Sequence, residues 1–224
     1  MSSEQAKAIH SITIGGKNTW DDWHLVPSSR PLVSPPGLKT QFVDLPGGDG
    51  ILDLTEALTG KPVYGNRTGS WEFLVMNDYQ SWELLYSSIL HHLHGKAHQV
   101  ILDDDPDYFY EGRFSLEEWA SNKDWSTVKI QYSLGPYKLS TTPRNLSASV
   151  SGSTTVGVSI SSQIGIVTDF TASAAGIKLQ CGYYTRTLAN GANPLVKIKM
   201  EPGDDGISFT GNGNVSFKVY EGGF

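Results

Sequence analysis

The sequence predicts a mainly β protein in two parts: an α+β unit with one helix, followed by a β-sandwich. The first observation is composition, since 24 of the 224 residues are Gly, 11 are Pro and only 18% are charged, which suits short strands joined by tight turns. The second is that apolar runs rich in Phe, Val, Leu and Trp are short and bounded by Gly or Pro. The third is that only one segment has convincing helical periodicity.

The first unit is predicted to cover residues 1–138 and to open with a hairpin around Gly15–Asn18, whose glycines tolerate positive φ. Four prolines between Pro27 and Pro36 then predict an extended arm, because proline removes ladder donors. An arm of that length is usually either disordered or docked on a neighbour. Further strands are expected at Lys39–Leu45, Ile51–Thr55 and Ser70–Met76, with three more between His98 and Leu134 and turns at Asp103–Asp107 and Ser121–Asp124.

The one predicted helix lies in the stretch "NDYQSWELLYSSILHHLHG". Asn77 and Gln80 resemble a capping box, and Gly95 is typical of a C-terminal stop. Apolar residues recur on one face at helical spacing, namely Trp82, Leu85, Ile89 and Leu93. This face is therefore expected to pack against the sheet.

The second unit is predicted to cover residues 139–224 as an all-β sandwich. Near Leu139 to Thr142 the composition changes, and the chain becomes rich in Ser, Thr, Gly and Val. Its length lies within the usual range for a domain. Strands are expected in the alternating stretch "SASVSGSTTVGVSIS" and at Ile177–Tyr184, Leu195–Met200, Gly206–Thr210 and Val215–Tyr220.

Charge, cysteine count and hydropathy exclude several classes of function. The formal net charge of −6 argues against a sequence-independent grip on nucleic acid, which relies on Lys and Arg. The single cysteine, Cys181, cannot form an internal disulfide and is expected to be a packed residue rather than a nucleophile. No stretch approaches the ~20 apolar residues of a membrane span, and the start has no apolar signal region, so a soluble protein without a membrane partner is expected.

Two similar loops stand far apart in the chain: "LPGGDGI" at Leu45–Ile51 and "EPGDDGI" at Glu201–Ile207. A phosphate-binding P-loop needs a Lys-Ser/Thr pair that is absent here, and Asp49 would repel a phosphate. A calcium loop needs more carboxylates than Asp49, or Asp204 with Asp205, can offer. Tight turns between strands are therefore the favoured interpretation of both loops.

Two clusters invite a metal hypothesis, although the sequence favours neither, and neither a metal nor a cofactor is expected. His91 and His94 share a helix face and His98 could fold back, but histidines in a last helical turn also interact favourably with the helix dipole. The run Asp103–Asp107 offers oxygen ligands, yet Pro106 favours a solvated turn.

Catalysis is not predicted anywhere in the chain. Glu117 and Glu118 are adjacent on an expected strand, so they point to opposite faces and cannot cooperate as acid and base. The GxSxG motif of a nucleophile elbow is absent. A wall-degrading enzyme is therefore the weakest of the functional hypotheses.

Sugar binding is the alternative functional hypothesis. Trp20 and Trp23 could form a stacking platform, although aromatic residues in a hairpin are more often core or interface. Tyr183 and Tyr184 could contribute from the second unit, but strand alternation would separate them onto opposite faces. A carbohydrate-binding module that contacts cell-wall polysaccharide is kept as this alternative.

The order of several motifs in residues 1–138 resembles the distal tail protein (Dit) family of long-tailed, non-contractile phages. The motifs are "LPGGDGILDLT", "VYGNR", "LHGK", "LDDDPDYFYEGR" and "YSLGPYK". The second unit is similar to the family only in architecture, where a galectin-like sandwich is common. The motif residues that the resemblance implies to be structural or assembly residues are Pro46, Gly47, Gly48, Asp49, Gly50, Asn66, Arg67, Gly95, Asp105, Pro106, Tyr110, Gly112 and Arg113.

This resemblance implies a non-enzymatic virion protein at the phage tail tip or baseplate, made in the bacterial host cytoplasm. It implies a hexameric ring that joins the tail tube protein to the tail-tip, baseplate or tail-associated lysin protein, with genomic DNA passing only transiently through the lumen. An acidic wall suits such a conduit because it repels DNA. A closed ring also needs two different complementary patches on each subunit. The candidate inter-subunit arm contains Pro27, Arg30, Pro31, Pro35 and Pro36.

Overall fold

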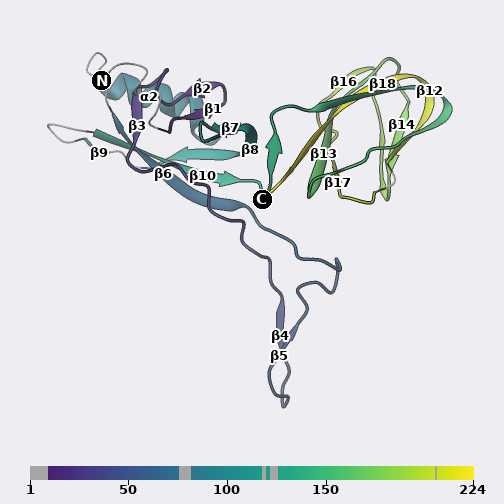
Figure 1. Ribbon diagram of the computed structural model, residues 1–224, viewed down its shortest axis with the longest axis horizontal. Helices are drawn as coiled ribbons and strands as arrows, with labels where there is room; N and C mark the ends of the chain where they lie inside the picture. Colours follow the sequence, from purple (N-terminus) through teal and green to yellow (C-terminus); the bar gives the residue numbers. More distant parts are fainter. Residues whose placement is uncertain (1–9, 76–81, 118–119, 122–125, 205) are drawn as a thin grey trace. The chain divides into compact units, whose positions relative to one another are not determined.

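A computed structural model describes residues 10–75, 82–117, 120–121, 126–204 and 206–224. The chain divides into two compact units, Met1–Lys138 with Phe224, and Leu139–Gly223, with strand β11 (Lys138–Ser140) at the division. Each unit is rich in antiparallel strands, so the predicted mainly β fold is confirmed (Figure 1). The capping residues expected at Asn77 and Gln80, and Glu118, lie outside the described residues.

Unit 1 is built on one antiparallel sheet. Its order runs β3-β6-β10-β8, β9 pairs with β10, and the sheet continues from β8 through β7 and β1 to β2. The β1–β2 turn at Gly15 and Gly16, with φ of 59° and 81°, confirms the first predicted hairpin. The strands are β1 (Ile12–Ile14), β2 (Lys17–Asn18), β3 (Leu25–Pro27), β6 (Arg67–Val75), β7 (Ala97–Leu102), β8 (Asp105–Leu116), β9 (Ala120–Ser121) and β10 (Ser126–Leu134).

The core of unit 1 lies between the sheet and helix α2 (Trp82–Leu93). Strand β10 alternates, since Ile130, Tyr132 and Leu134 are buried whereas Gln131 and Ser133 are half-buried. The predicted apolar helix face is confirmed, because three of its four members are fully buried: Leu85, Ile89 and Leu93. The helix ends at the expected glycine, as Gly95 has a φ of 72° that a residue with a Cβ rarely adopts.

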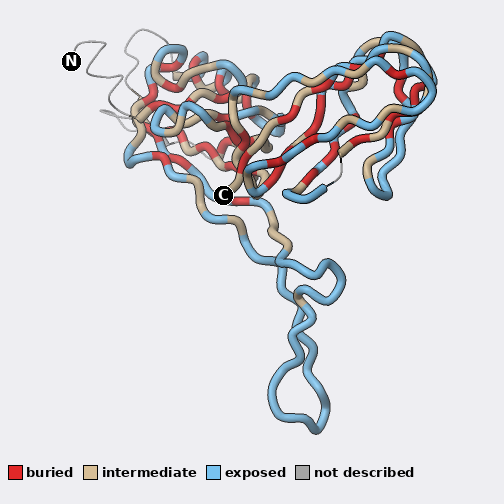
Figure 2. Tube along the Cα trace, turned by 45° about the vertical axis from the view of Figure 1, so that its right-hand side comes forward, coloured by how far each residue is buried: buried red, intermediate tan, exposed pale blue. Residues whose placement is uncertain are grey.

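Between β3 and β6 the chain leaves the sheet as an arm, residues 28–66 (Figures 1 and 2). The two limbs pair at the base through the Leu38–Tyr64 bridge. Further out, the paired strands β4 (Phe42–Asp44) and β5 (Ile51–Asp53) form a sheet of their own, whose residues are all exposed. The strands expected here therefore exist, but they form a separate ribbon and contribute nothing to the core.

Unit 2 is a second antiparallel assembly with its own apolar core. Its last strand organises it, because that strand pairs with β12 over thirteen positions and also with β13 and β14. The strands are β12 (Arg144–Val156), β13 (Ile164–Ala172), β14 (Lys178–Cys181), β15 (Tyr184–Thr187), β16 (Gly191–Asn193), β17 (Ile198–Met200) and β18 (Ile207–Gly223).

Two sequence-based expectations for unit 2 were wrong in detail, and one long strand was missed. The two strands expected at Gly206–Thr210 and Val215–Tyr220 are one strand, β18, because the glycines between them, Gly211 and Gly213, adopt φ near 140° and β12 pairs across them. The single strand expected at Ile177–Tyr184 is a hairpin that turns at Gly182. Strand β13 was not predicted at all.

The close packing of β8 against β10 makes Gly112 sensitive to substitution. A Cβ at this position would lie 2.2 Å from the carbonyl oxygen of Ser133 and 2.7 Å from the Cα of Leu134, both of which are backbone atoms. We expect Gly112→Ala to lower the free energy of unfolding by about 1–3 kcal/mol, since the strands must separate to admit the methyl group. Thermal and urea unfolding measure this change.

The matched control is Gly37→Ala in the arm, where a Cβ would meet no atom within 4 Å and φ is not positive. It should leave the unfolding midpoint unchanged. If the Gly112→Ala protein were as stable as this control, the result would contradict the close approach of β8 to β10 at Gly112.

Candidate functional site

Four of the motif residues that carry the family resemblance, Asn66, Arg67, Gly112 and Arg113, lie where strands β6, β8 and β10 run side by side, whereas Pro46–Gly50 lie on the arm. Asn66, just before β6, donates from Nδ2 to the hydroxyl of Ser133 on β10 at 3.1 Å. Arg113 on β8 donates from Nη1 to the carbonyl oxygen of Gly95 at 2.9 Å. Gly112 lies against the backbone of β10. Segments far apart in the sequence therefore build one region of unit 1.

Arg67, at the start of β6, is the buried charge of this region. Its exposed fraction is 4%, and the guanidinium lies 5.5 Å from the centre of the Tyr110 ring. Nε donates to the carbonyl oxygen of Pro136 at 2.9 Å, and Nη1 donates to that of Ser34 at 3.0 Å. Burial lowers the pKa of Arg67, although the nearby Tyr110 and Tyr132 oppose that shift. An arginine remains charged at neutral pH, so its hydrogen bonds hold the chain tightly.

The first limb of the arm is anchored to the sheet by two aromatic side chains. Trp71 donates from its indole nitrogen to the carbonyl oxygen of Leu32 at 2.9 Å. The hydroxyl of Tyr132 accepts from the backbone nitrogen of Ser34 at 3.2 Å and donates to the Leu32 carbonyl at 3.3 Å. With Arg67, these side chains fix residues 32–34 on unit 1. The arm therefore starts from a rigid base.

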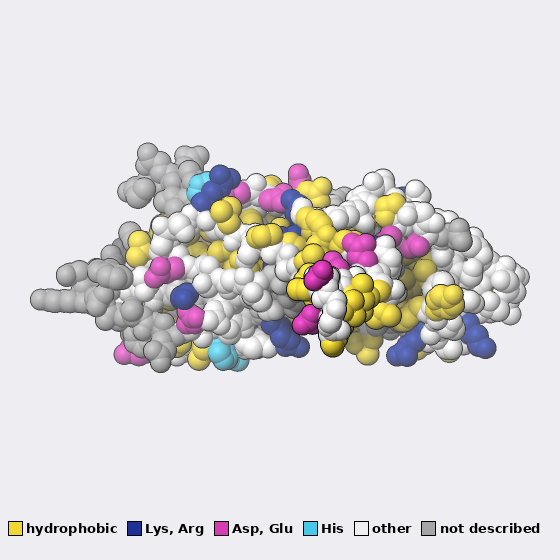
Figure 3. Space-filling model, turned by 90° about the horizontal axis from the view of Figure 1, so that it is seen from below, with side chains coloured by type: hydrophobic (Ala, Val, Ile, Leu, Met, Phe, Trp, Pro, Cys, Tyr) yellow, Lys and Arg dark blue, Asp and Glu magenta, His cyan; other side chains and the backbone are white. Residues whose placement is uncertain are grey.

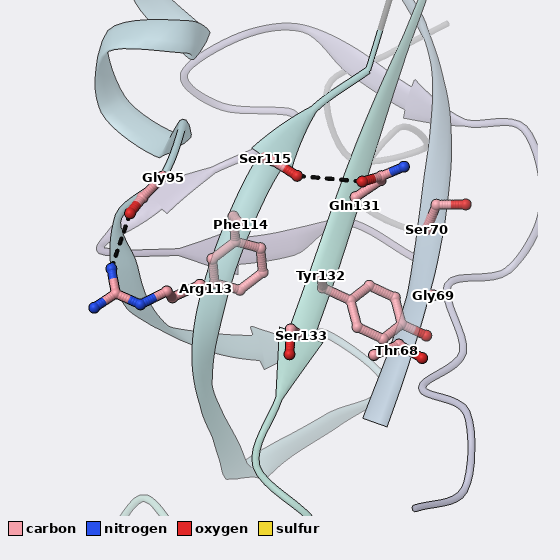
Figure 4. A pocket seen from close by; sticks show the side chains of 10 residues that line it. All are labelled: Thr68, Gly69, Ser70, Gly95, Arg113, Phe114, Ser115, Gln131, Tyr132 and Ser133. Atoms are coloured by element: carbon pink, nitrogen blue, oxygen red, sulfur yellow. Dashed lines mark hydrogen bonds between the residues drawn. The ribbon is translucent and has the colours of Figure 1, made fainter. Parts of the chain in front are cut away.

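An open groove of about 570 Å³ crosses β6, β10 and β8 beside this base (Figure 4). Small polar side chains surround it, and Ser115 donates to Gln131 across two neighbouring strands at 3.3 Å. Its lining residues are Thr68, Gly69, Ser70, Gly95, Arg113, Phe114, Ser115, Gln131, Tyr132 and Ser133. We call this surface the β6–β10–β8 groove.

The charge at the edge of the groove comes from Arg113. Its side chain is exposed and donates to the Gly95 carbonyl at the end of α2. Among the described residues no carboxylate pairs with it. Lys129, further along β10, is by contrast neutralised by Glu117 at 2.5 Å. The Lys129 contact also lowers the pKa of Glu117.

The outer part of the arm, residues 42–58, is both apolar and acidic; we call it the arm tip. Half of the fourteen large apolar side chains exposed by the described residues lie within it, and Leu58 is 98% exposed. Its charges are all negative, because it contains Asp44, Asp49, Asp53 and Glu56 but no Lys or Arg. Figure 3, which views the molecule from below, shows hydrophobic and acidic side chains gathered together near its centre. An exposed apolar surface of this kind typically marks an interaction site.

The "LPGGDGI" loop forms the end of the arm tip. Its central residues, Pro46–Gly50, connect β4 to β5, with Gly47 and Gly50 at φ of 79° and 83° and the Gly48 nitrogen donating to the Leu45 carbonyl. The similar loop before β18 is closed by Asp204, whose carboxylate accepts from the Glu201 nitrogen at 2.7 Å. Both loops are turns between strands, as the sequence predicted.

The proline-rich segment is the part of the arm nearest the sheet. Pro27 is the last residue of β3, and Pro31 is buried. Arg30 pairs with Asp104 of the same unit at 2.8 Å, and Pro35 and Pro36 follow just before the limbs pair. The projecting part of the arm is thus formed by residues 37–66, which follow the proline-rich segment Pro27–Pro36.

The histidines near the end of α2 are arranged differently from the expected His91 and His94 pair. The rings of His92 and His98 stack with centroids 4.9 Å apart. His92 Nε2 lies 3.1 Å from the Ile14 carbonyl oxygen. His94 Nδ1 accepts a hydrogen bond from the Leu116 backbone nitrogen. Burial lowers the pKa of His92, and the neighbouring His98, Lys17 and Lys96 reinforce this shift against the hydrogen bond to Ile14. Across the described ranges, no three His, Cys, Asp or Glu side chains gather as a metal site.

The acidic run is held by ion pairs and hydrogen bonds rather than arranged around a cation. Asp104 contacts His10 and Arg30 at 2.7 and 2.8 Å, and Asp105 pairs with Lys138 at 2.5 Å. Partial burial raises the pKa of Asp104, but the contacts with His10 and Arg30 outweigh this effect, so that the pKa is lowered overall. Pro106 lies within β8, so the turn is shorter than predicted and covers Asp103 and Asp104.

The aromatic residues considered for sugar stacking do not form a platform. Trp23 is buried at 2% exposure and contacts the ring of His92, whereas the ring of Trp20 is tilted at 55° to that of His24. Tyr183 is fully exposed at the β14–β15 turn, so it lies in a turn rather than on a strand face. Cys181 is half-buried, and burial raises the pKa of its thiol, which disfavours the nucleophilic thiolate.

The arm tip and the β6–β10–β8 groove were not identified as functional surfaces from the sequence. The sequence did contain a signal for the arm tip. The stretch from Thr40 to Gly60 has seven Leu, Ile, Phe and Val residues and four carboxylates, but it has no Lys or Arg. The groove left no comparable signal, since its Ser, Thr and Gly residues come from several segments spread over more than sixty positions, and strand register brings β6, β8 and β10 together.

Comparisons with known proteins support the fold. No family model matches the chain, and no curated protein matches it. Among solved structures the chain is similar to the crystal structure of SPP1 Dit (gp 19.1), described as a paradigm of hub adsorption apparatus in phages that infect Gram-positive bacteria. The TM-score is 0.54 at 14% identity, covering 96% of this chain and 100% of that chain. The resemblance predicted from the sequence is thereby confirmed in the fold.

Removing the buried guanidinium should loosen the base of the arm. We expect Arg67→Met to lower the free energy of unfolding by about 1–3 kcal/mol, because the carbonyl groups of Ser34 and Pro136 lose their donors. Exchange of the Ser34 amide hydrogen should also become faster. Arg30→Met is the control, since its ion pair is largely exposed and should contribute about 0–1 kcal/mol. Equal effects of the two substitutions would contradict the anchoring role of Arg67.

His92 should make unit 1 less stable in acid. Because its pKa is lowered in the folded state, the unfolded chain binds more protons below the ordinary histidine pKa of about 6.5. The contribution of neutral His92 is therefore complete above that pH and is lost as the pH falls below it. We expect His92→Gln to flatten the decline of the unfolding midpoint between roughly pH 6.5 and 5. The exposed His91→Gln should retain the wild-type decline, and identical profiles for both variants would contradict the assignment.

Proposed function

We propose that this chain is a structural protein of a phage tail that forms a ring between the tail tube and the tail-tip or baseplate proteins. The observation that carries the proposal is a fold similar to SPP1 Dit over nearly the whole chain. The contacts of Asn66 and Arg113 around β6, β8 and β10 and the projecting apolar arm add support. Virion localisation and a hexameric state belong to the same proposal.

The arm provides a physical basis for ring formation. Residues 42–58 expose many apolar side chains but contribute none of the core of unit 1. Burying such side chains in an assembly is favourable by about 25 cal/mol per Å² of apolar surface removed from water. The candidate inter-subunit segment Pro27–Pro36 would then serve as the anchored base, and the residues beyond it would reach the neighbour. A closed ring also needs unlike surfaces on each subunit to meet.

The ring would act without catalysis or a cofactor. It would hold tail proteins in register and let DNA pass, and the formal net charge of −6 favours a wall that repels DNA rather than one that retains it. None of the helical structure in the described ranges has the length and apolar character needed to cross a membrane.

A carbohydrate-binding module is the less favoured alternative. Unit 2 has a groove of about 350 Å³ where Asp169, at a positive φ of 55°, pairs with Lys218 at 3.2 Å. The aromatic side chains in its lining, Phe170 and Phe217, are buried, so they offer no stacking face to a sugar. The adaptor role is therefore the better supported proposal.

The mass in solution tests the ring. We expect light scattering to give six times the chain mass of 24.4 kDa, with ring-shaped particles in negative stain. Replacing residues 40–62 by Asn-Gly should abolish that assembly but leave unit 1 folded, because Lys39 and Val63 already pair across the arm and a two-residue turn can join them.

The control for the shortened arm is its own circular dichroism spectrum and unfolding midpoint, which should match those of the wild type. An arm-deleted protein that still assembled into six-fold rings would contradict the role of the arm. A wild type that remained monomeric at every concentration, both alone and with tail tube protein, would contradict the ring itself.

A further inference from the structure

We propose that the ring of Phe224 anchors the second limb of the arm, because it is bound by the side chains of Tyr64, Arg67 and Tyr137. We call these three side chains the aromatic cradle. Phe224 follows strand β18 in the sequence, yet it belongs to unit 1. The anchoring acts within a single copy, so it goes beyond the proposed ring and does not depend on it.

Two tyrosines of the cradle contact Phe224 in favourable geometries. Tyr64 meets it edge-on, with ring centroids 4.6 Å apart and planes at 74°. Tyr137 stacks on it, with ring centroids 5.2 Å apart and planes at 14°. Edge-to-face and offset-stacked pairs are the arrangements that aromatic rings prefer, and each stabilises beyond the burial of its area. The ring of Phe224 is therefore bound in a defined orientation.

Arg67 adds a cation to the cradle. Its guanidinium carbon lies 5.9 Å from the centre of the Phe224 ring and 5.5 Å from that of the Tyr110 ring. A ring face within about 6 Å attracts a cation, and the attraction is larger where water is excluded. Arg67 is buried, and its Nη2 has no hydrogen-bond partner among the described residues. Contact with the Phe224 ring therefore stabilises a buried charge whose hydrogen bonds are incomplete.

The cradle brings together three segments that lie far apart in the sequence. Tyr64 and Arg67 belong to the stretch "VYGNR", and Tyr137 belongs to "YSLGPYK". Phe224 comes from a third segment, after β18. Neither tyrosine was identified as a functional residue from the sequence, because no local pattern relates either of them to Phe224.

Tyr64 is the residue through which Phe224 acts on the arm. It lies on the second limb and forms the bridge to Leu38 of the first limb. Beside this bridge, the Gly65 nitrogen donates to the Gly37 carbonyl oxygen at 2.7 Å. A contact that holds Tyr64 therefore holds the two limbs together at the base of the arm.

The first limb has anchors of its own. Trp71 and Tyr132 bond to the backbone of residues 32–34, and Tyr132 accepts from the Ser34 nitrogen. Phe224 is 45% exposed and lies outside the core of unit 1, so its replacement should not unfold the unit. Loss of its ring should instead loosen the pairing at Gly65 and leave Ser34 in place.

Amide hydrogen exchange on the full chain gives the first test. Phe224→Ala should make the Gly65 amide exchange about tenfold faster, because the paired state of the limbs loses its aromatic contacts. The Ser34 amide should keep its wild-type rate. Phe224→Tyr retains the ring and should restore the wild-type rate at Gly65, whereas Phe224→Leu retains only apolar volume and should not.

The matched control is Tyr183→Ala, which removes a fully exposed aromatic side chain outside the cradle and should leave both rates unchanged. A wild-type rate at Gly65 in Phe224→Ala would overturn the proposal. Equal acceleration at Gly65 and Ser34 would do so too, since it would indicate a general loss of stability. A wild-type rate in Phe224→Leu would show that no aromatic ring is required, which also overturns it.

A double-mutant cycle tests the contact between the stacked rings. Tyr137→Leu alone should accelerate exchange at Gly65. Combined with Phe224→Ala, it should give no faster exchange than Phe224→Ala alone, because residues in contact have non-additive effects. Single effects that multiply in the double variant would contradict the contact.

A fluorine label locates the ring without relying on stability. 4-Fluorophenylalanine at position 224 should give a fluorine resonance shifted by the Tyr137 ring, and Tyr137→Leu should move it toward the resonance of the unfolded chain. This readout applies to a single copy and to any assembly. A resonance that Tyr137→Leu leaves unchanged would overturn the cradle, whereas a wild type that never assembles would remove the proposed ring of subunits and leave the cradle intact.

Discussion

The register between β10 and its two neighbours is the constraint on which the rest of unit 1 depends. It places Tyr132 opposite Gly69 on β6 and Phe114 on β8, so the tyrosine hydroxyl reaches over the glycine to the first limb of the arm. A shift by one residue would turn Tyr132 to the solvent face and bury Gln131 or Ser133 instead. The apolar core, the anchored base of the arm and the groove would then be lost together.

Within that register, one buried cation joins three parts of the chain. Arg67 donates to a carbonyl group in the first limb of the arm and to another after β10, and its guanidinium lies over Tyr110 of β8. A buried charge is costly unless its donors are satisfied, yet Nη2 of Arg67 has no partner among the described residues. A buried guanidinium with one unsatisfied nitrogen therefore favours a role in fixing the direction of the arm rather than in adding stability alone.

Local sequence was sufficient for elements whose signals are short-range. The helix face, the Gly95 stop, the β1–β2 hairpin and both Pro-Gly-x-Asp-Gly turns were predicted correctly, because periodicity and glycine conformation act within a few residues. It was insufficient for β18, where Gly211 and Gly213 resemble a break in the sequence. Pairing with β12 over the whole length keeps the strand continuous, and that pairing is a long-range effect.

The sequence by itself determined the mainly β composition, the positions of most turns, the acidic charge and the likeness to distal tail proteins, since each is carried by residue types in order along the chain. Only the tertiary structure decided that the strands around "LPGGDGI" project from the sheet rather than join it, because apolar residues in an exposed ribbon have the same pattern as those in a core. It also decided that Gly95, Arg113 and Ser133 border one groove. Their proximity arises from strand pairing across the sheet, which no local pattern encodes.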